Sequence, residues 1–416
     1  MNNIKKITAC RMCGNKTLVR VVDLGEQYLT GVFPDYIMKD ELTCGSLCLV
    51  KCHGGDDVCG LLQLEHSYDL DEMYGYNYGY RSGLNTHMVK HLGSKVDVIL
   101  KQSDLKNGDL VIDIGSNDGT TLGFYPEDLL LVGIDPSGAK FSHHYKPNIK
   151  LIADFFSKEL LNDQYPDKKA NVVTSFSMLY DLERPLDFVN DIASILDPDS
   201  GLWFFEQSYM PLMLEKVAFD TICHEHIEYY GLKQIMWLVE QAGMKIIDIE
   251  LNDINGGSFS VIASLKSALH KQNDEAIQRL LNNESDLNLD ELEPYQQFSK
   301  NIDKACSELK EFIKNARSDN KRVCGLGAST KGNVLLQYCG LTSDDVEAIG
   351  EVNTDKYGAL TPGSWINIKA ESEVLASKPD YLIVLPWHFK EFFLNNDLFK
   401  GHTLVFPLPS LEIVKV

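Results

Sequence analysis

The stretch of residues 108–125, GDLVIDIGSNDGTTLGFY, constrains the fold more than any other part of the sequence. Its apolar run, Leu110–Ile114, is typical of a strand buried in a parallel sheet. The run leads into a glycine turn, Gly115–Gly119, which is followed by a segment with helical character. A strand, a glycine turn and a helix in this order form the nucleoside cradle of doubly wound folds. The sequence therefore predicts an α/β protein.

Acidic residues around this turn favour one cofactor over another. A dinucleotide site needs G-x-G-x-x-G so that a pyrophosphate can approach the helix, but here Asn117 takes the middle position and Asp118 follows it. A carboxylate in the turn repels a pyrophosphate and tolerates a cationic amino acid tail. Asp135, at the end of the next apolar run, can accept both ribose hydroxyls. The pattern predicts S-adenosylmethionine (SAM), held by Gly115, Asn117, Asp135, Asp154 and Phe155. An α/β core without a ligand remains the alternative.

The alternation of strands and helices continues on both sides of the turn. Residues 84–100 and 184–196 have helical spacing, and the runs ANVVTSFS and GLWFFEQ are predicted to be strands. The run MKIIDIELNDINGGSFSVIASL indicates two strands separated by NDINGG, which predicts an antiparallel pair closing the sheet.

Cysteine spacing near the N-terminus predicts a metal site. Cys10 and Cys13 form a C-x2-C knuckle, and Cys52 with Cys59 can complete a tetrahedral zinc site. The site is expected to be structural because no open catalytic position stands out, and a small module gains stability from a metal cross-link. Cys44 and Cys48 are alternatives for the last two ligands. Buried thiols without a metal are the other interpretation.

The last third of the chain contains a second glycine turn. Residues 268–316 are polar with apolar residues at helical spacing, which indicates connecting helices. RVCGLGASTKGN then predicts another strand, turn and helix, where backbone N–H groups, hydroxyls and Lys331 can clamp a diphosphate. A substrate nucleotide fits this turn better than a second cofactor does, whereas the alternative makes Lys331 an ordinary surface lysine.

Composition excludes several classes of protein. The 416 residues suggest two or three domains, and the formal net charge of −21 argues against a nucleic acid partner. No apolar run is long enough to span a membrane, and the N-terminal residues lack an apolar signal core. We therefore expect a cytoplasmic protein that binds neither nucleic acid nor membrane. The oligomeric state is not predicted, and a monomer is compatible with the sequence.

The segment Asp220–Tyr230, DTICHEHIEYY, concentrates groups that can move protons. If it is helical, Cys223, His226, Tyr229 and Tyr230 share one face, with Glu225 beside them. Histidine suits proton abstraction next to a ketone because its pKa lies near neutrality, and a tyrosine can donate to the enolate. The alternatives are a zinc site, a structural polar cluster, or His224 as the base. Tyr180, after the predicted fourth strand, either faces the substrate or packs in the core.

Motifs along almost the whole chain resemble the sugar C-methyltransferases that act on nucleotide-linked keto-deoxysugars, such as those of tetronitrose and kijanose biosynthesis. The matching motifs are CGLLQL, YGYRSG, DIGSNDG, VGIDPS, FEQSYMP, CHEHIEYY, NGGSFS, GLGASTKGN, TPGSWI and VLPWHF. The resemblance implies a zinc module (1–68), a class I SAM methyltransferase domain with a Rossmann-like sheet (69–267), a helical connector (268–316) and a Rossmann-like domain that helps to bind the nucleotide sugar (317–416).

The resemblance also implies roles for individual residues. His226 looks like the general base, with Glu225 beside it, and Tyr80 and His224 complete the predicted catalytic set. The family has a tyrosine where this chain has Cys223, so another tyrosine is needed to replace its hydroxyl. The predicted substrate contacts are Tyr78, Tyr229, Tyr230, Lys331 and Asn333.

Two other reactions and one binding role compete with this hypothesis. A sugar O-methyltransferase can use the same parts, with His226 deprotonating an alcohol. An NAD-dependent nucleotide-sugar oxidoreductase is disfavoured by Asp118 and the missing middle glycine. A zinc-bearing binding protein without catalysis leaves the Cys223–Tyr230 cluster unexplained.

Overall fold

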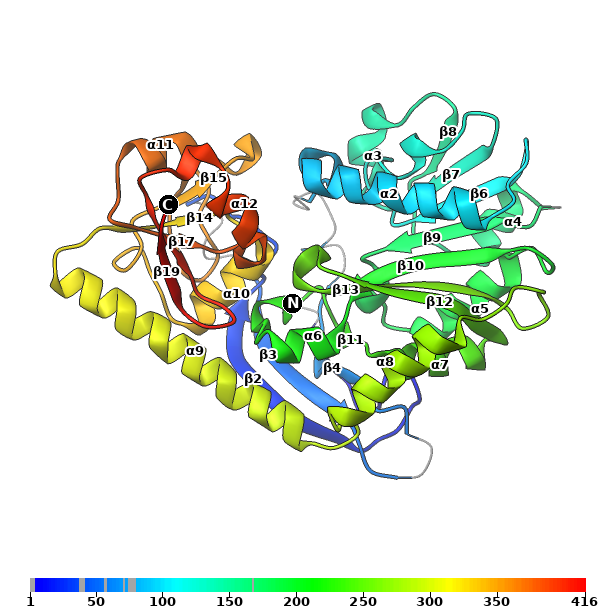
Figure 1. The fold of residues 1–416 in the computed structure, drawn as a ribbon, viewed down its shortest axis with the longest axis horizontal. Helices are drawn as coiled ribbons and strands as arrows, with labels where there is room; N and C mark the ends of the chain where they lie inside the picture. The colour runs from blue at the N-terminus through cyan, green and yellow to red at the C-terminus, as the bar shows by residue number, and fades with distance from the viewer. Residues whose placement is uncertain (1–3, 37–41, 56–57, 70–71, 74–79, 167) are drawn as a thin grey trace.

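The computed structural model describes residues 4–36, 42–55, 58–69, 72–73, 80–166 and 168–416. Figure 1 shows two α/β parts, one cyan to green and one orange to red, with a blue sheet from the N-terminal residues between and below them. The carboxyl-terminal part and the central part each contain one large sheet with helices on its faces. No helix among the described residues has the length and apolar character needed to cross a bilayer.

The N-terminal sheet combines strands that are far apart in the sequence. Its order is β11-β4-β3-β2, and all neighbours are antiparallel. A separate two-stranded sheet pairs β1 with β5. The strands are β1 (Lys5–Lys6), β2 (Leu18–Tyr28), β3 (Cys44–Cys52), β4 (Leu62–Leu64), β5 (His66–Ser67) and β11 (Glu228–Tyr229). Because β11 follows the CHEH motif, this sheet ties the proton-handling segment to the N-terminal module.

The central sheet has seven strands in the order β12-β13-β10-β9-β6-β7-β8. The predicted first strand, Leu110–Ile114, is β6 and is buried along its whole length because helices cover both faces. The reversed strand β13 lies between β10 and β12, which confirms the predicted antiparallel pair. The other strands are β7 (Leu130–Ile134), β8 (Ile149–Ile152), β9 (Val172–Phe176), β10 (Leu202–Ser208), β12 (Met244–Asn252) and β13 (Ser258–Leu265).

Helices predicted from spacing cover this sheet. The 84–100 and 184–196 patterns form α2 (Thr86–Gln102) and α5 (Pro185–Ile195). The side chain of Asn85 caps α2 by accepting hydrogen bonds from the first turn, and a proline opens α5. The remaining helices of this part are α3 (Gly138–Phe141), α4 (Lys158–Gln164), α6 (Met210–Glu215) and α7 (Leu232–Gln241).

The C-terminal sheet has six strands in the order β16-β15-β14-β17-β18-β19, and only β19 is antiparallel. Its strands are β14 (Val323–Leu326), β15 (Ile349–Glu351), β16 (Ile368–Ala370), β17 (Tyr381–Val384), β18 (Thr403–Phe406) and β19 (Glu412–Lys415). Its helices are α10 (Thr330–Tyr338), α11 (Glu371–Ala376) and α12 (Lys390–Leu394).

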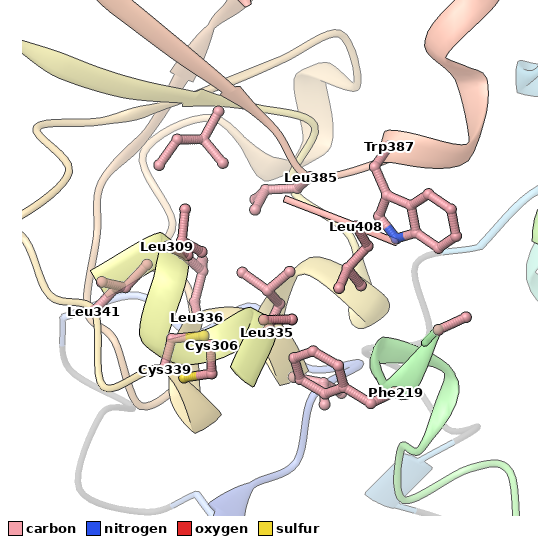
Figure 2. Packing of buried hydrophobic residues seen from close by; sticks show 14 of the residues in the cluster. Phe219, Cys306, Leu309, Leu335, Leu336, Cys339, Leu341, Leu385, Trp387 and Leu408 are labelled. Atoms are coloured by element: carbon pink, nitrogen blue, oxygen red, sulfur yellow. The ribbon is translucent and has the colours of Figure 1, made fainter. Parts of the chain in front are cut away.

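Two helices join the parts, as the 268–316 pattern predicts. They are α8 (Asp274–Asp286) and α9 (Glu293–Ser318). In Figure 1, α9 runs below the C-terminal part, and its apolar face continues onto β2. Figure 2 shows Cys306 and Leu309 of α9 packed near Leu335 and Leu336 of α10, with Phe219 of the central part beside them. The C-terminal sheet, the connector and the N-terminal sheet therefore share one hydrophobic cluster, which fixes the parts around the site.

Candidate active site

Four cysteines of the N-terminal module come together as a metal site. The Sγ atoms of Cys10, Cys13, Cys52 and Cys59 all lie within 4.8 Å of one another. The Cys10–Cys59 and Cys13–Cys52 sulfur distances are 3.5 and 3.6 Å. Tetrahedral zinc with Zn–S bonds of about 2.3 Å requires sulfurs roughly 3.8 Å apart, so this cluster fits the ion. Cys48 instead donates to the carbonyl of Val22. A zinc ion bound by these four cysteines would hold the start of the module to β3 and the loop after it.

The predicted cofactor turn has the conformation that close contact with a ligand requires. Gly115, Asn117 and Gly119 have φ values of 74°, 49° and 74°, in the left-handed region. A Cβ atom at Gly115 would meet Met178, the residue before the short helix η5 (Leu179–Asp181), at 3.3 Å. The side chain of Asn117 accepts from Ser82 N and donates to Tyr80 O. The turn is thus fixed to residues 80–83, which contain the end of the YGYRSG motif.

Buried acids organise the turn as an anionic pole. Asp135 accepts hydrogen bonds from the backbone N–H of Asn117 at 2.8 Å and from Ser137 N and Oγ at 2.7 and 2.6 Å. Asp113 accepts from Thr174 Oγ1, and burial raises the pKa of its carboxyl to about 7. Carboxyl groups at this pole suit a cofactor with a cationic end and oppose a pyrophosphate. The residues present therefore fit SAM.

The predicted adenine contacts lie at the end of β8. Asp154 and Phe155 are exposed, and the Phe155 side chain keeps 51% of its surface open. Asp154 accepts a hydrogen bond from the N–H of Phe155 at 2.7 Å. An exposed aromatic ring beyond the carboxyl end of β8, on the same edge of the parallel sheet as the glycine turn, offers a stacking surface for a purine.

The CHEH segment is not a helix, so the helical arrangement considered for residues 220–230 is wrong. A short 3-10 helix, η6 (Phe219–Thr221), precedes a turn, and β11 follows at Glu228. Two pairings that are distant in sequence override the local pattern: η6 packs against α10, and Tyr229 of β11 pairs with Leu62 of β4. The side chains of the segment consequently point toward different parts of the molecule.

His226 has the geometry of a neutral base. Its Nδ1 lies 3.1 Å from the carbonyl oxygen of Thr221 and donates to it, so Nε2 carries the lone pair of the neutral ring. The ring packs edge-on against Tyr180, with centroids 4.3 Å apart. Burial first, and then the nearby charge of Lys331, lower the pKa of His226 to about 3. Tyr180 lies two residues after Met178, which adjoins Gly115, so one short segment after β9 contacts both the glycine turn and the imidazole.

His224 lies elsewhere. Its ring is fully buried and packs edge-on against Tyr68 of the N-terminal module at 4.6 Å. Burial lowers the pKa of His224 to about 4, and the ring is neutral. The structure therefore separates the two histidines of the motif: His226 faces Tyr180 and His224 faces the module.

Glu225 reaches a contact between all three parts of the chain. Its Oε1 lies where a Cβ atom at Gly31 would be, 2.0 Å away, and Thr330 Oγ1 is 3.6 Å from the same point. Burial raises the pKa of the Glu225 carboxyl, and the side chains of Cys223 and Thr30 oppose this shift. Its Oε2 is buried, and no described donor reaches it with good hydrogen-bond geometry.

The predicted tyrosines are not gathered in one place. Tyr229 is buried on β11 near Glu225 and Cys223, whereas Tyr230 donates to the carboxyl of Glu228 near the zinc cysteines. Adjacent strand residues point to opposite faces, which separates these two side chains. Tyr80 is 48% exposed beside the glycine turn. Tyr78 lies outside the described residues.

Two residues at the start of α10 lie near the CHEH segment: Lys331 is half-buried and Asn333 is fully buried. Lys331 Nζ donates to the carbonyl of Asn255 at 2.7 Å, and burial lowers the pKa of its ammonium group although the Asp220 carboxylate opposes this shift. Asn333 Nδ2 donates to the carbonyl of Thr30 at 2.7 Å. The half-buried lysine thus lies near enough to His226 for its charge to act on the imidazole.

The structure adds residues that sequence reasoning missed. Asp220 is buried and accepts a hydrogen bond from Trp387 Nε1 at 2.8 Å. His388, next along the chain, has its pKa lowered by burial and by the charges of Lys331 and Lys216. The VLPWHF motif was part of the resemblance, but its spacing alone gave these side chains no role. Gly31 also joins the site, and no local signal pointed to it.

Comparison with known proteins gives ordered matches along the chain. Three family profiles match: "Putative zinc binding domain" over residues 10–74, "Methyltransferase domain" over 85–249 and "C-methyltransferase C-terminal domain" over 253–409. The C-methyltransferase NovU of Streptomyces niveus is 27% identical over 422 aligned residues, which cover 99% of this chain and 98% of that protein.

Solved structures overlap with part of the chain. Magnesium protoporphyrin IX methyltransferase from Synechocystis PCC 6803, with bound SAH, has 14% identity and a TM-score of 0.33 over 43% of this chain and 83% of its own. A putative methyltransferase in complex with the Haloferax volcanii Trm112 activator has 14% identity and a TM-score of 0.36 over 44% and 93%. The assignment rests on the sequence matches, which name all three parts of this chain: it is a SAM-dependent C-methyltransferase with an N-terminal zinc-binding module.

Proposed function

We propose that this enzyme methylates a carbon next to the ketone of a nucleotide-linked keto-deoxysugar, with His226 as the general base. The observation that carries the proposal is the tautomer of His226. Its Nδ1–H is held by the Thr221 carbonyl, which leaves Nε2 as a proton acceptor beside Tyr180. A carbon can be methylated as a nucleophile only after it loses a proton, and a fixed neutral imidazole can accept that proton.

The charge that forms during proton abstraction has a compensating cation nearby. When the carbon is deprotonated, its electron pair delocalises onto the ketone oxygen as an enolate, and the imidazole becomes cationic. Lys331 is half-buried and lies near enough to His226 for its charge to lower the pKa of the imidazole. A cation in a buried site stabilises an oxyanion much more than it does in water. Bound SAM supplies an electrophilic methyl group to the nucleophilic carbon.

The nucleotide-sugar assignment draws its support from the C-terminal part. The turn after β14 leads into α10, where Ser329 caps the helix by accepting from Gly332 N. The N-terminal end of this helix offers backbone N–H groups next to Lys331, a combination that favours an anionic diphosphate. The similarity to a C-methyltransferase along the whole chain supports transfer of the methyl group to a carbon atom.

Product mass spectrometry tests the proposal. The enzyme is incubated with SAM and a panel of thymidine-, GDP- and CDP-linked 4-keto sugars, and the product is fragmented to locate the added methyl group. We expect a carbon-linked methyl group from one acceptor, and His226→Asn to lower kcat on the order of 10²–10⁴-fold, the usual contribution of a positioned base. Calorimetry should show unchanged SAM affinity in this variant. Full turnover by His226→Asn, or a methyl group on oxygen, contradicts the proposal.

A further inference from the structure

Residues Tyr28–Tyr36, here called the strap, leave β2 of the N-terminal module and run along the C-terminal part. Tyr28 exchanges two hydrogen bonds with Gln337 of α10: its N–H donates to Oε1 at 2.8 Å and its carbonyl accepts from Nε2 at 3.2 Å. Two residues later, the carbonyl of Thr30 accepts from Asn333 Nδ2 at 2.7 Å. Asn333 and Gln337, one turn apart on the same face of α10, thus hold the start of the strap.

The rest of the strap has its own anchors on the C-terminal part. The ammonium group of Lys356 lies 4.2 Å from the ring centroid of Phe33. The carbonyl of Pro34 accepts from Leu360 N at 2.8 Å, and Tyr36 donates to Asn367 at 3.2 Å. Hydrogen bonds and a cation–π contact spaced along nine residues fix the path of the strap more firmly than any one of them could.

Gly31 lies between these anchors and faces the Glu225 carboxyl. A Cβ atom on Gly31 would be 2.0 Å from Glu225 Oε1 and 3.2 Å from its Cδ. Its backbone does not have a positive φ, so an alanine is conformationally allowed there and only the carboxyl excludes it. An alanine at position 31 therefore forces the Glu225 carboxyl to move.

The same place contains buried acceptors that no described group satisfies. Glu225 Oε2 and Asn333 Oδ1 are both buried without a hydrogen-bond donor, and Asn333 has no exposed surface. Each uncompensated acceptor costs about 1–3 kcal/mol, so a bound group with donors is the natural partner. Both acceptors lie where the central part, the C-terminal part and the strap meet.

We propose that Gly31 is a positioning residue for Glu225 and that the strap of the zinc-bearing module forms one wall of the acceptor site. The inference rests on the proposed function, since it takes Glu225, the residue before the proposed base His226, to lie beside the acceptor. It gives the module a role in catalysis beyond the stability that its metal supplies. The strap sets where the carboxyl lies, and α10 sets where the strap lies.

Gly31→Ala tests this role directly. The added methyl group must displace the Glu225 carboxyl, and a misplacement of about 1 Å can lower kcat on the order of 10²-fold. SAM affinity by calorimetry and zinc content by chelator titration should equal those of the wild type. Gly123→Ala is the matched control, because its nearest neighbour is the flexible end of Lys146 at 3.8 Å. Wild-type kcat in Gly31→Ala overturns the proposal.

A shorter carboxylate provides a rescue that a merely structural role does not predict. In Glu225→Asp the side chain is one methylene shorter and leaves room for a Cβ atom at position 31. Adding Gly31→Ala to Glu225→Asp should therefore lower kcat no further, although Gly31→Ala alone lowers it strongly. Additive losses, measured as a double-mutant cycle on kcat, contradict positioning through Glu225.

Two further variants separate the possible failures. If Gly31→Ala does not fold, Gln337→Ala removes the hydrogen bonds to Tyr28 without crowding Glu225, and kcat should fall several-fold at unchanged SAM affinity. Wild-type kcat in that variant overturns the role of the strap. If Glu225→Ala keeps wild-type kcat, Glu225 has no role beside the acceptor and the strap inference fails, while the proposed role of His226 still stands. If Glu225→Ala is inactive while Gly31→Ala is not, only the strap inference fails.

Discussion

The central and C-terminal sheets have the same parallel core but opposite charges at its carboxyl end. Beginning from the outer parallel strand, the central order is β8-β7-β6-β9-β10 and the C-terminal order is β16-β15-β14-β17-β18. In each, the first strand in sequence leads through a glycine turn into the next segment, and the following strand ends in an acid, Asp135 or Glu351. Both acids accept a backbone hydrogen bond from their glycine turn.

The difference lies in the side chains that follow each turn. The central turn carries Asp118 and lies over Asp113, whereas the C-terminal turn carries Ser329 and Lys331. Under the proposed function, a shared scaffold presents an anionic pole to SAM and a cationic pole to the diphosphate of the substrate. The comparison then teaches that strand order builds the two turns and that a few residues at their rims select the ligand. The predictions below are ordered from the largest effect to the smallest.

The largest effect is expected from replacing the two equivalent acids, Asp135 and Glu351, one at a time. Asp135→Asn removes a charged acceptor from three donors, and a loss of roughly 2–3 kcal/mol is expected for such bonds. Titration calorimetry should show the SAM Kd rising about 30–150-fold. Glu351→Gln, its counterpart, should leave the SAM Kd unchanged. Equal changes of the SAM Kd in the two variants would mean that SAM does not bind to the central part alone.

Removing the positive charge of Lys331 tests the C-terminal turn. Lys331→Met takes a positive charge away from His226, so the pKa of the imidazole should rise from its lowered value of about 3. The base is active when unprotonated, and the acidic limb of kcat/KM should therefore move to higher pH, with a loss of about tenfold in kcat/KM for about 1.4 kcal/mol of charge stabilisation. Lys321→Met, an exposed lysine of the same part, is the control. An unmoved acidic limb contradicts the proximity of Lys331 to the base.

Two exposed phenylalanines, one in each half, test which half contacts SAM. Phe155 and Phe392 are 51% and 60% exposed, one in each half. If Phe155 stacks on the adenine, Phe155→Ala should weaken SAM about 2–10-fold, as expected for an aromatic contact of about 0.5–1.5 kcal/mol. Phe392→Ala should change nothing in the same titration. Unchanged SAM affinity in Phe155→Ala removes this residue from the cofactor site.

The smallest effect concerns His224, which belongs to neither cradle. Burial lowers its pKa to about 4, so the unfolded chain binds a proton that the folded chain does not, and stability falls as the pH drops below the ordinary value of about 6.5. Between pH 7.5 and 6 this histidine should cost about 0.8 kcal/mol. Urea unfolding at both pH values should show a smaller difference in His224→Gln. Identical pH dependence in the two proteins contradicts a neutral buried ring.

The regular elements followed from the sequence because their signals are local. Leu110–Ile114, the glycine turn after it and the two strands around NDINGG each have a periodicity or turn chemistry that needs no distant partner. The zinc cluster was also predictable, because the ion accepts few ligand types and the knuckle spacing is specific.

The conformation of the CHEH segment did not follow, because distant contacts determine it. Its local pattern allows a helix, but pairing of β11 with β4 and packing of η6 on α10 place it in an extended turn. His224 and Glu225 consequently point toward the N-terminal module. The contact of Gly31 with Glu225 joins residues nearly two hundred positions apart, and spacing within one segment carries no information about such a pair.

Hydrogen exchange at the acceptor carbon tests the central claim most directly. The wild type and His226→Asn are incubated in deuterated water with the keto sugar that is methylated, in the absence of SAM, and deuterium at the carbon next to the ketone is followed by NMR. The account predicts deuterium incorporation with the wild type, and much slower incorporation with His226→Asn. Exchange at equal rates in the two proteins would show that another group removes the proton and would contradict the account.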